Sequence, residues 1–387
     1  MTLIKVKSRG TDNVSGRKNL LINGAMQVAQ RATSATGLGA SSGYFTLDRH
    51  RFSSGNTAGR LTQSQASVTD LPGFANAMKL DCTTADTSIA ANEDCSLQYR
   101  FEGQDLQQLK KGTSSAEKVT VSFYMKTNKA FTFMCELDDT DNNRFNGQRF
   151  TTSTSWTRHT LTFVGDTTGT LDDDTARSMM LNFWIHAGSN FTSGTYTANT
   201  WQSRAATDVN RAVGIGSFFD NTANEIQLTG IQMEVGDSAS DFEHRSFGEE
   251  LDLCHRYFYK PVTADVGTYS PFPIIFNRTV STGSNGYFAF NVPLPKPMRT
   301  IPTFTHNLAN TNHAGAGAAA AAGNWQFYWQ NQGWGSYAGS GNMNTINRAM
   351  SGTSSVHLGN YYITPSVVNF DQITIGRDLT FQFDAEL

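Results

Sequence analysis

Charged residues are few in this sequence: Asp, Glu, Lys and Arg make up 16% of its 387 residues, against about a quarter in typical soluble domains. Thr, Ser, Asn, Gly and aromatic residues are abundant instead, a composition typical of antiparallel sandwiches and barrels. The near-neutral charge balance argues against a nucleic-acid partner, because phosphate binding needs a broad basic face. We therefore predict an all-β protein that binds no nucleic acid.

Long apolar runs and cysteine clusters are absent as well. No stretch approaches the length of a transmembrane helix, so we expect no membrane insertion. The four cysteines, Cys82, Cys95, Cys135 and Cys254, are scattered without a CxxC pair, which argues against zinc ligation and against a dense disulfide framework. Cys82 could pair with Cys95, but we expect reduced thiols.

Motifs that carry catalysis are also missing, since the sequence holds no HExxH, P-loop or dinucleotide-binding fingerprint. Gly39, Ser41 and Gly43 have the spacing of a nucleophile elbow but lack its strand and helix. The acidic run from Asp138 resembles a calcium loop, yet Arg144 occupies the glycine position. Carboxylate pairs for glycoside hydrolysis stay open, because their members can lie far apart in sequence. We predict a protein that is not an enzyme and has no cofactor or metal.

A basic arm, residues 1–18, opens the chain. Its five Lys and Arg residues stand against one Asp, a net charge of +4 in a chain whose total is −3. Ile4 and Val6 offer one apolar edge. We interpret the arm as a docking segment rather than a frayed terminus, with these residues as docking candidates: Ile4, Lys5, Val6, Lys7, Arg9, Arg17 and Lys18.

Residues 19–245 show short alternating runs separated by turn residues, the pattern of an antiparallel sandwich. In three of these runs, alternate apolar residues share one face and are predicted to point into the core. The first set is Val119, Val121, Phe123 and Met125, the second set is Phe131, Phe133, Cys135 and Leu137, and the third set is Met179, Leu181, Phe183 and Ile185. Near residue 230 the apolar phase shifts by one, which predicts a β-bulge at Gly230.

A helix is predicted over residues 246–260, because Ser246 and Glu249 have capping-box spacing and an apolar stripe runs from Phe247 to Phe258. We expect it to connect the sandwich to a second β domain, residues 261–387. Packing of this helix against symmetry mates is the alternative. Within the second domain the Gly/Ala-rich run 313–323 predicts a loop. The aromatic residues after it fill a small core or present a binding surface.

One mixed face is the best candidate for a binding site. If consecutive strands lie side by side, aromatic rings alternate there with amide, carboxylate and guanidinium groups, the combination that a sugar ring needs for stacking and hydrogen bonding. The alternative is that this face packs against a sheet edge, a long loop or a neighbouring protomer. The glycan-binding candidates are Tyr124, Glu136, Trp156, Arg158, Asn182, Trp184 and His186, with Trp325, Trp329, Trp334 and Tyr337 near the distal end.

Several segments resemble a recurrent family of phage virion proteins. They are residues 19–31 (NLLINGAMQVAQR), 44–52, 228–236 (LTGIQMEVG) and 241–245 (DFEHR), and downstream 247–260, 293–304 and 384–387. The resemblance implies a jelly roll similar to carbohydrate-binding modules in a tail-fibre-like protein. The arm is most similar to those of structural proteins from T7-like phages of marine bacteria. One departure is that Ala25, Met26 and Gln27 follow Gly24, where similar modules often have an acidic calcium ligand.

The resemblance implies a virion protein, a homo-oligomer that is a trimer, and a role at the host surface. Our leading hypothesis is an appendage that docks on tail or capsid proteins through residues 1–18 and binds a host-surface glycan. The alternatives are a purely architectural adaptor or capsid decoration without glycan binding, and a depolymerase whose carboxylates meet across subunits.

Overall fold

The computed structural model describes residues 18–261, 275–279, 286–306, 326–329, 333–335, 349–352, 355–363, 372–374 and 381–387. The chain divides into two compact units, residues 1–247 and 248–387. The arm residues from Ile4 to Arg17, like the run 313–323, lie outside the described residues. No helix in the described part of the chain combines the length and apolarity needed to span a bilayer.

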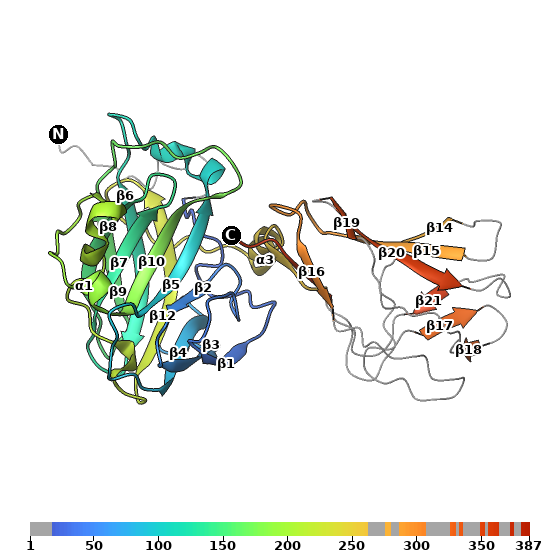
Figure 1. The fold of residues 1–387 in the computed structure, drawn as a ribbon, viewed down its shortest axis with the longest axis horizontal. Helices are drawn as coiled ribbons and strands as arrows, with labels where there is room; N and C mark the ends of the chain where they lie inside the picture. Colours follow the sequence, from blue (N-terminus) through green and yellow to red (C-terminus); the bar gives the residue numbers. More distant parts are fainter. Residues whose placement is uncertain are drawn as a thin grey trace, which may run out of the picture. The chain divides into compact units, whose positions relative to one another are not determined.

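The first unit is a jelly-roll β-sandwich of two antiparallel sheets (Figure 1). Sheet A has the order β1 (Ser34–Leu38), β3 (Arg60–Ser67), β4 (Asn76–Thr84), β12 (Glu225–Val235), β6 (Val119–Thr127) and β9 (Thr157–Phe163). Sheet B has the order β11 (Gln202–Ser203), β8 (Arg144–Thr151), β7 (Thr132–Asp139), β10 (Arg177–Ala187), β5 (Asp94–Glu102) and β2 (Arg51–Gly55). The predicted all-β jelly roll is confirmed.

Short helices lie in the connections of this unit. They are η2 (Gly103–Asp105), η3 (Gln107–Leu109), α1 (Ser189–Thr192), α2 (Arg204–Thr207), η4 (Asp208–Asn210) and η5 (Phe218–Asp220). Four of them, α1, α2, η4 and η5, belong to the long connection between β10 and β12.

The core fills the space between the two sheets. The alternating residues predicted to face inward on β6, β7 and β10 are all buried in one cluster. Phe123 shows how the sheets interdigitate: its ring lies 4.8 Å from that of Phe183 and 5.0 Å from that of Phe150, both in edge-to-face contact. All four cysteines are buried and free, as predicted.

The predicted bulge at Gly230 is also confirmed. The pairing of β12 with β6 shifts register between Thr229 and Gln232, and Gly230 has a φ of +63°. A Cβ at this position would lie 2.7 Å from the ring of Phe74 and 2.9 Å from that of Tyr124. The glycine therefore permits both the left-handed backbone and the packing of two aromatic rings over the bulge.

A buried polar network, which we call the clasp, joins the two ends of the sandwich through Asn19, Gln232, Glu243 and Arg245. Asn19 donates to the carbonyl of Ile231 at 3.1 Å and accepts from the N–H of Met233 at 3.1 Å. Arg245 donates to the carbonyls of Asn19 and Leu21 at 2.7 and 2.9 Å. Glu243 accepts from the Asn19 N–H at 2.8 Å and donates through its own N–H to Gln232 at 2.7 Å. The clasp residues come from segments that carried the resemblance.

Helix α3 (Phe247–Cys254) starts at the last residue of the first unit, and the rest of it belongs to the second unit. The strands of the second unit are β13 (Phe258–Tyr259), β14 (Ile275–Thr279), β15 (Gly286–Pro293), β16 (Thr303–His306), β17 (Gln326–Trp329), β18 (Gly333–Gly335), β19 (Ala349–Gly352), β20 (Ser355–Ile363), β21 (Gln372–Thr374) and β22 (Phe381–Asp384). They form the sheets β13-β22-β16, β14-β15-β20-β19 and β18-β17-β21.

Helix α3 is shorter than the 246–260 segment predicted. Phe258 pairs with Asp384 in an antiparallel ladder instead of extending the apolar stripe of a helix. Phe247, at the other end of the predicted stripe, is 57% exposed. The i, i+4 spacing of Cys254 and Phe258 is compatible with a helix, but a strand far along the chain supplies the backbone partners that decide the outcome.

We predict that Asn19→Ala lowers the free energy of unfolding by about 2–4 kcal/mol, because it leaves the buried N–H groups of Leu21 and Met233 without their acceptor. Urea unfolding of the full chain measures this change. Asn92→Ala is the matched control, since Asn92 is exposed, and it is expected to change stability by less than about 0.5 kcal/mol. Equal stability of the two variants would show that the clasp does not hold the sandwich closed.

Candidate functional site

The predicted mixed face is divided between the two sides of the sandwich, so the single site expected from the sequence is wrong. Tyr124 lies on β6 and Arg158 on β9, two strands of sheet A, and Trp156 immediately precedes β9. The other four candidates, Glu136, Asn182, Trp184 and His186, lie on β7 and β10 of sheet B. The side of each strand was identified correctly, but β6 and β7 follow each other in sequence and belong to different sheets.

The outer face of sheet B is covered by the connection formed by residues 188–217. Ala212 of this connection forms a small apolar cluster with Met134 and Trp184, against which Phe191 and Tyr196 pack. Trp184 is only 4% exposed and donates its indole N–H to Glu136. A long loop therefore covers this face, the alternative that we had kept open, and the four sheet B candidates are structural in this arrangement.

Arg211 holds the connection onto sheet B. Its guanidinium makes a two-pronged contact with Glu136, at 2.7 Å from Nε and 3.0 Å from the second amino group, and also donates to Asp138 at 2.7 Å. The guanidinium carbon lies 4.8 Å from the centre of the Trp184 ring. Glu136 and Asp138 are fully buried, and Arg211 is 5% exposed.

Burial sets the electrostatics of this network. Desolvation raises the pKa of Glu136, although the Arg211 charge opposes it. Desolvation also disfavours the charge on Arg211, but Glu136 and Asp138 outweigh it and raise the pKa of the guanidinium. Each charge is thus tolerated because its partner is present.

On the outer side of sheet A, an aromatic cluster formed by Phe74, Tyr124, Phe242 and His244 keeps part of its surface exposed. The ring of Phe74 lies 5.2 Å from Tyr124, 5.1 Å from Phe242 and 5.2 Å from His244. His244 is exposed, and the other three rings are half-buried. This cluster offers ring surface to a ligand next to the Gly230 bulge.

Polar groups surround the aromatic cluster. Arg158 donates to the Ser122 hydroxyl at 3.2 Å and to the carbonyl of Ser240, with its guanidinium carbon 6.0 Å from the centre of the Tyr124 ring. Trp156 donates to Asp70 at 2.8 Å.

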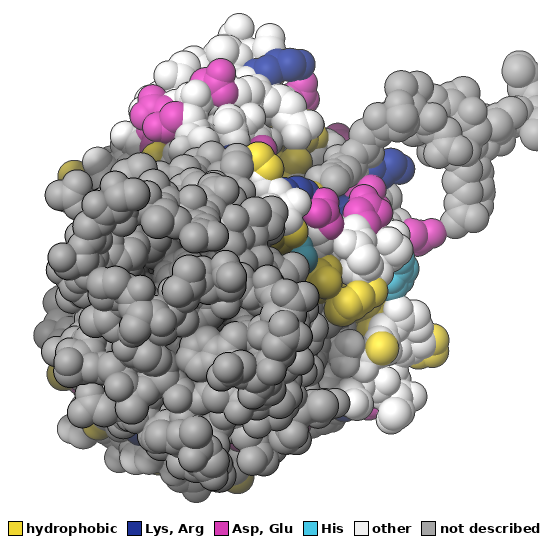
Figure 2. Space-filling view, turned by 90° about the vertical axis from the view of Figure 1, so that its right-hand side faces the viewer, with side chains coloured by type: hydrophobic (Ala, Val, Ile, Leu, Met, Phe, Trp, Pro, Cys, Tyr) yellow, Lys and Arg dark blue, Asp and Glu magenta, His cyan; other side chains and the backbone are white. Residues whose placement is uncertain are grey.

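The same Asp70 carboxylate accepts from Lys126 at 2.7 Å. The hydrogen bonds from Lys126 and then Trp156 lower the pKa of Asp70. Figure 2 shows acidic, basic, histidine and hydrophobic side chains intermixed on the described part of one face of the molecule.

Phe74, Phe242 and His244 were not predicted as site residues. They lie outside the strands, where no alternating pattern assigns a side chain to a face. Phe242 and His244 belong to the DFEHR segment, whose two aromatic rings among charged residues were a usable signal. Phe74 gave only the weak signal of an aromatic residue beside the turn residues Pro72 and Gly73.

The distal candidates are only partly described. Trp329 is the last residue of β17 and pairs with Gly333, while Trp334 in β18 pairs with Tyr328. Trp325 and Tyr337 lie outside the described residues. At the arm, Lys18 is exposed and its backbone N–H lies 3.4 Å from Glu243 of the clasp.

No protein-family model matches this chain. No curated protein matches it either. Solved structures similar to it include the family 11 carbohydrate-binding module of the cellulosomal cellulase Lic26A-Cel5E of Clostridium thermocellum, with 14% identity and a TM-score of 0.26 over 54% of this chain and 98% of that one.

Two further solved structures are similar to this chain at comparably low sequence identity and TM-score. TmCBM61, solved with beta-1,4-galactotriose, has 9% identity and a TM-score of 0.26 over 56% of this chain and 99% of the module. The enzymatically active domain of bacteriophage CBA120 tailspike protein 4 has 9% identity and a TM-score of 0.29, over 56% of this chain and 21% of that one. At such TM-scores the function of this chain has to be inferred from its own residues.

We predict that Arg211→Met lowers the free energy of unfolding by about 3–5 kcal/mol at neutral pH, because it leaves buried carboxylates without their cation. Loss of Arg211 also raises the pKa of Glu136 further. A carboxyl group whose pKa is higher in the folded state destabilises that state only when it ionises, so the penalty grows as pH rises above the unfolded-state pKa of about 4.3. The difference from wild type should therefore be smaller at pH 4 than at pH 7.

Urea unfolding at both pH values tests this prediction. Arg204→Met is the control, because Arg204 reaches Asp138 from a half-exposed position, and we expect a smaller loss of stability. A loss for Arg211→Met that does not change with pH would contradict the electrostatic explanation.

Proposed function

We propose that this protein is a non-enzymatic virion appendage that binds a host-surface glycan at the aromatic cluster of sheet A. The observation that carries the proposal is the cluster itself, in which half-exposed rings lie beside arginine, aspartate and serine side chains. A sugar ring stacks its apolar face on such rings and bonds its hydroxyls to such groups. The covered face of sheet B supports the choice of sheet A, because Trp184 and Glu136 bind the protein's own chain.

The virion part of the proposal comes from the sequence resemblance. It includes docking of the arm on tail or capsid proteins, assembly as a homotrimer and localisation in the virion. It also includes a relationship to structural proteins of T7-like phages of marine bacteria. A trimer would make weak glycan sites useful, since later contacts are intramolecular and raise the overall affinity about 10²- to 10⁴-fold where the geometry permits.

A purely architectural adaptor is the second candidate, and one observation favours it. Phe242 and His244 of the aromatic cluster flank Glu243 of the clasp, which contacts Lys18 at the base of the arm. A subunit that bound at the arm would lie close to these rings. Oxidative footprinting of assembled particles separates the two candidates: strong labelling of Tyr124 and Trp156 supports glycan binding, and protection supports an interface.

We predict that Tyr124→Ala weakens glycan binding about five- to tenfold, because one stacked ring contributes roughly 1 kcal/mol. The measurement is retention of the purified full-length protein on envelope polysaccharide from candidate hosts, scored together with release of new reducing ends. Tyr44→Ala is the control, since Tyr44 is also half-buried and is not part of the aromatic cluster. Unchanged retention of Tyr124→Ala would reject this site, and release of reducing ends would indicate a depolymerase.

We also predict that a chain lacking residues 1–18 folds but is not incorporated into particles, because the proposed docking contacts are lost. Quantification of the protein in purified particles, with a Tyr44→Ala chain as the folded control, measures this. Incorporation at the normal level would remove the docking role of the arm while leaving the glycan site to be judged by its own test.

A further inference from the structure

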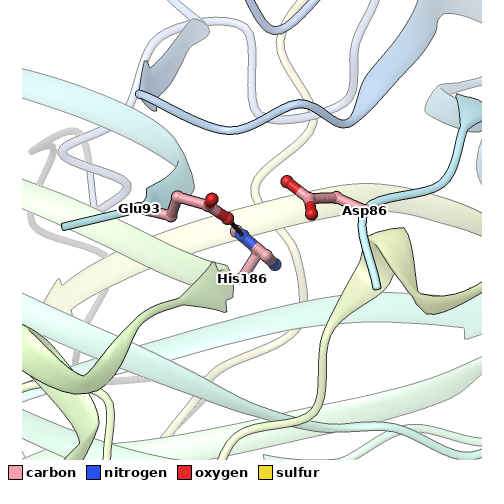
Figure 3. A group of neighbouring side chains, drawn as sticks. All are labelled: Asp86, Glu93 and His186. Atoms are coloured by element: carbon pink, nitrogen blue, oxygen red, sulfur yellow. Dashed lines mark hydrogen bonds and ion pairs between the residues drawn. The ribbon is translucent and has the colours of Figure 1, made fainter. Parts of the chain in front are cut away.

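Three buried side chains meet at one end of β10, where the connection formed by residues 188–217 begins and ends. His186 is near the end of β10, Glu93 lies just before β5, and Asp86 follows β4. One ligand atom from each of them lies within 4.8 Å of the other two. Their exposures are 0%, 5% and 5%, and Figure 3 shows the side chains converging from separate elements.

Each of the three side chains is oriented by a partner outside the group. The Nδ1 atom of His186 lies 2.8 Å from the hydroxyl of Ser217. Asp86 accepts hydrogen bonds from the Thr57 hydroxyl and the Ala58 N–H, both at 2.8 Å. One oxygen of Glu93 accepts from the N–H of Ala90 at 3.0 Å, and the other lies 3.0 Å from Nε2 of His186. Such outer contacts fix the direction of metal ligands and the tautomer of a histidine.

The geometry and charge of this group suit a small divalent cation. Two ligand atoms that are each about 2.0–2.2 Å from one zinc ion are roughly 3–3.5 Å apart. The His186 Nε2 to Glu93 Oε2 distance of 3.0 Å lies in that range, and the Asp86 ligand atom lies within 4.8 Å of both. With a neutral imidazole the three side chains carry a formal charge of −2, which a divalent cation balances. The imidazole nitrogen favours a transition metal over calcium or magnesium, which prefer oxygen ligands.

We propose that Asp86, Glu93 and His186 bind a divalent transition metal of the zinc class. In the bound state Nδ1–H would donate to Ser217 and the lone pair of Nε2 would face the metal, in place of the contact with Glu93. The alternative occupant is a proton shared among the same groups, which needs no metal.

The site has a structural role in the fold. The connection formed by residues 188–217 starts and ends beside it, because the Gly188 N–H donates to the carbonyl of Glu93 at 2.8 Å and Ser217 contacts His186. The Asp86 N–H donates to the carbonyl of Phe219 just after the connection. A metal here would tie the base of the connection that covers sheet B to the segment between β4 and β5.

Metal content tests the proposal directly. The purified full chain is stripped with EDTA, incubated with ZnCl₂, passed through gel filtration and analysed for zinc by mass spectrometry. We expect about one zinc ion per wild-type chain, the same for His255→Gln, whose histidine lies in the second unit, and at least a tenfold reduction for His186→Gln. Glu93→Gln is a second variant in case His186→Gln does not fold, which circular dichroism reveals.

Two further readouts distinguish a built site from surface binding. Cobalt(II) in place of zinc should give visible absorption bands in wild type that are lost in His186→Gln. Zinc should also slow tryptic cleavage after Arg204 in wild type and leave the rate in His186→Gln unchanged. The proposal is overturned if wild type retains no zinc, or if folded His186→Gln retains as much zinc as wild type.

Discussion

The buried guanidinium of Arg211 determines which face of this jelly roll is open to a ligand. Glu136 lies inside β7 and Asp138 near its end, both with side chains directed away from the core, so an apolar cover over them would leave two carboxylates without a partner. The connection 188–217 brings the required cation. Because a broken buried ion pair is far more costly than an intact one, the connection has one favourable position over sheet B.

Two residues from the segments that carried the sequence resemblance, Asn19 and Arg245, stabilise the fold of this chain. Asn19 and Arg245 join the first and last segments of the sandwich through backbone carbonyls and N–H groups, contacts that do not depend on any ligand. This explains why such motifs report the fold more reliably than the activity. The clasp also places Lys18, the last residue of the arm, beside Glu243, which in turn contacts Arg245.

Alternation predicted the core faces because the two-residue period of a strand does not depend on which strands are its neighbours. Phe123, Cys135 and Phe183 were assigned inward for this reason, and all three are buried. The sheet to which a strand belongs is set by contacts distant in sequence, and period alone cannot supply it. For this reason the candidates predicted to share one mixed face lie on two different sheets in the structure.

The parts of the site that were missed have the same origin. Arg211, Phe74 and Phe242 lie in connections, where side-chain direction follows from the backbone path rather than from a repeat. Helix α3 ends early for a related reason, since β22, at the far end of the chain, supplies the pairing that converts Phe258 to a strand residue. By contrast, the phase shift at Gly230 was visible in the sequence because it interrupts a strand pattern that is otherwise regular.

Gly230 links the fold to the proposed function. The bulge brings the backbone of β12 close enough for Phe74 and Tyr124 to pack over it, so these two rings are held by packing on the sheet. A site held in this way does not have to order its aromatic side chains on binding, which lowers the entropic cost for a weak ligand. Phe74, Phe242 and His244 come from segments outside the strands, so changes there would alter the ligand preference while the buried faces of β6 and β12 stay the same. The arrangement therefore separates the residues that specify the sandwich from those that would specify a glycan.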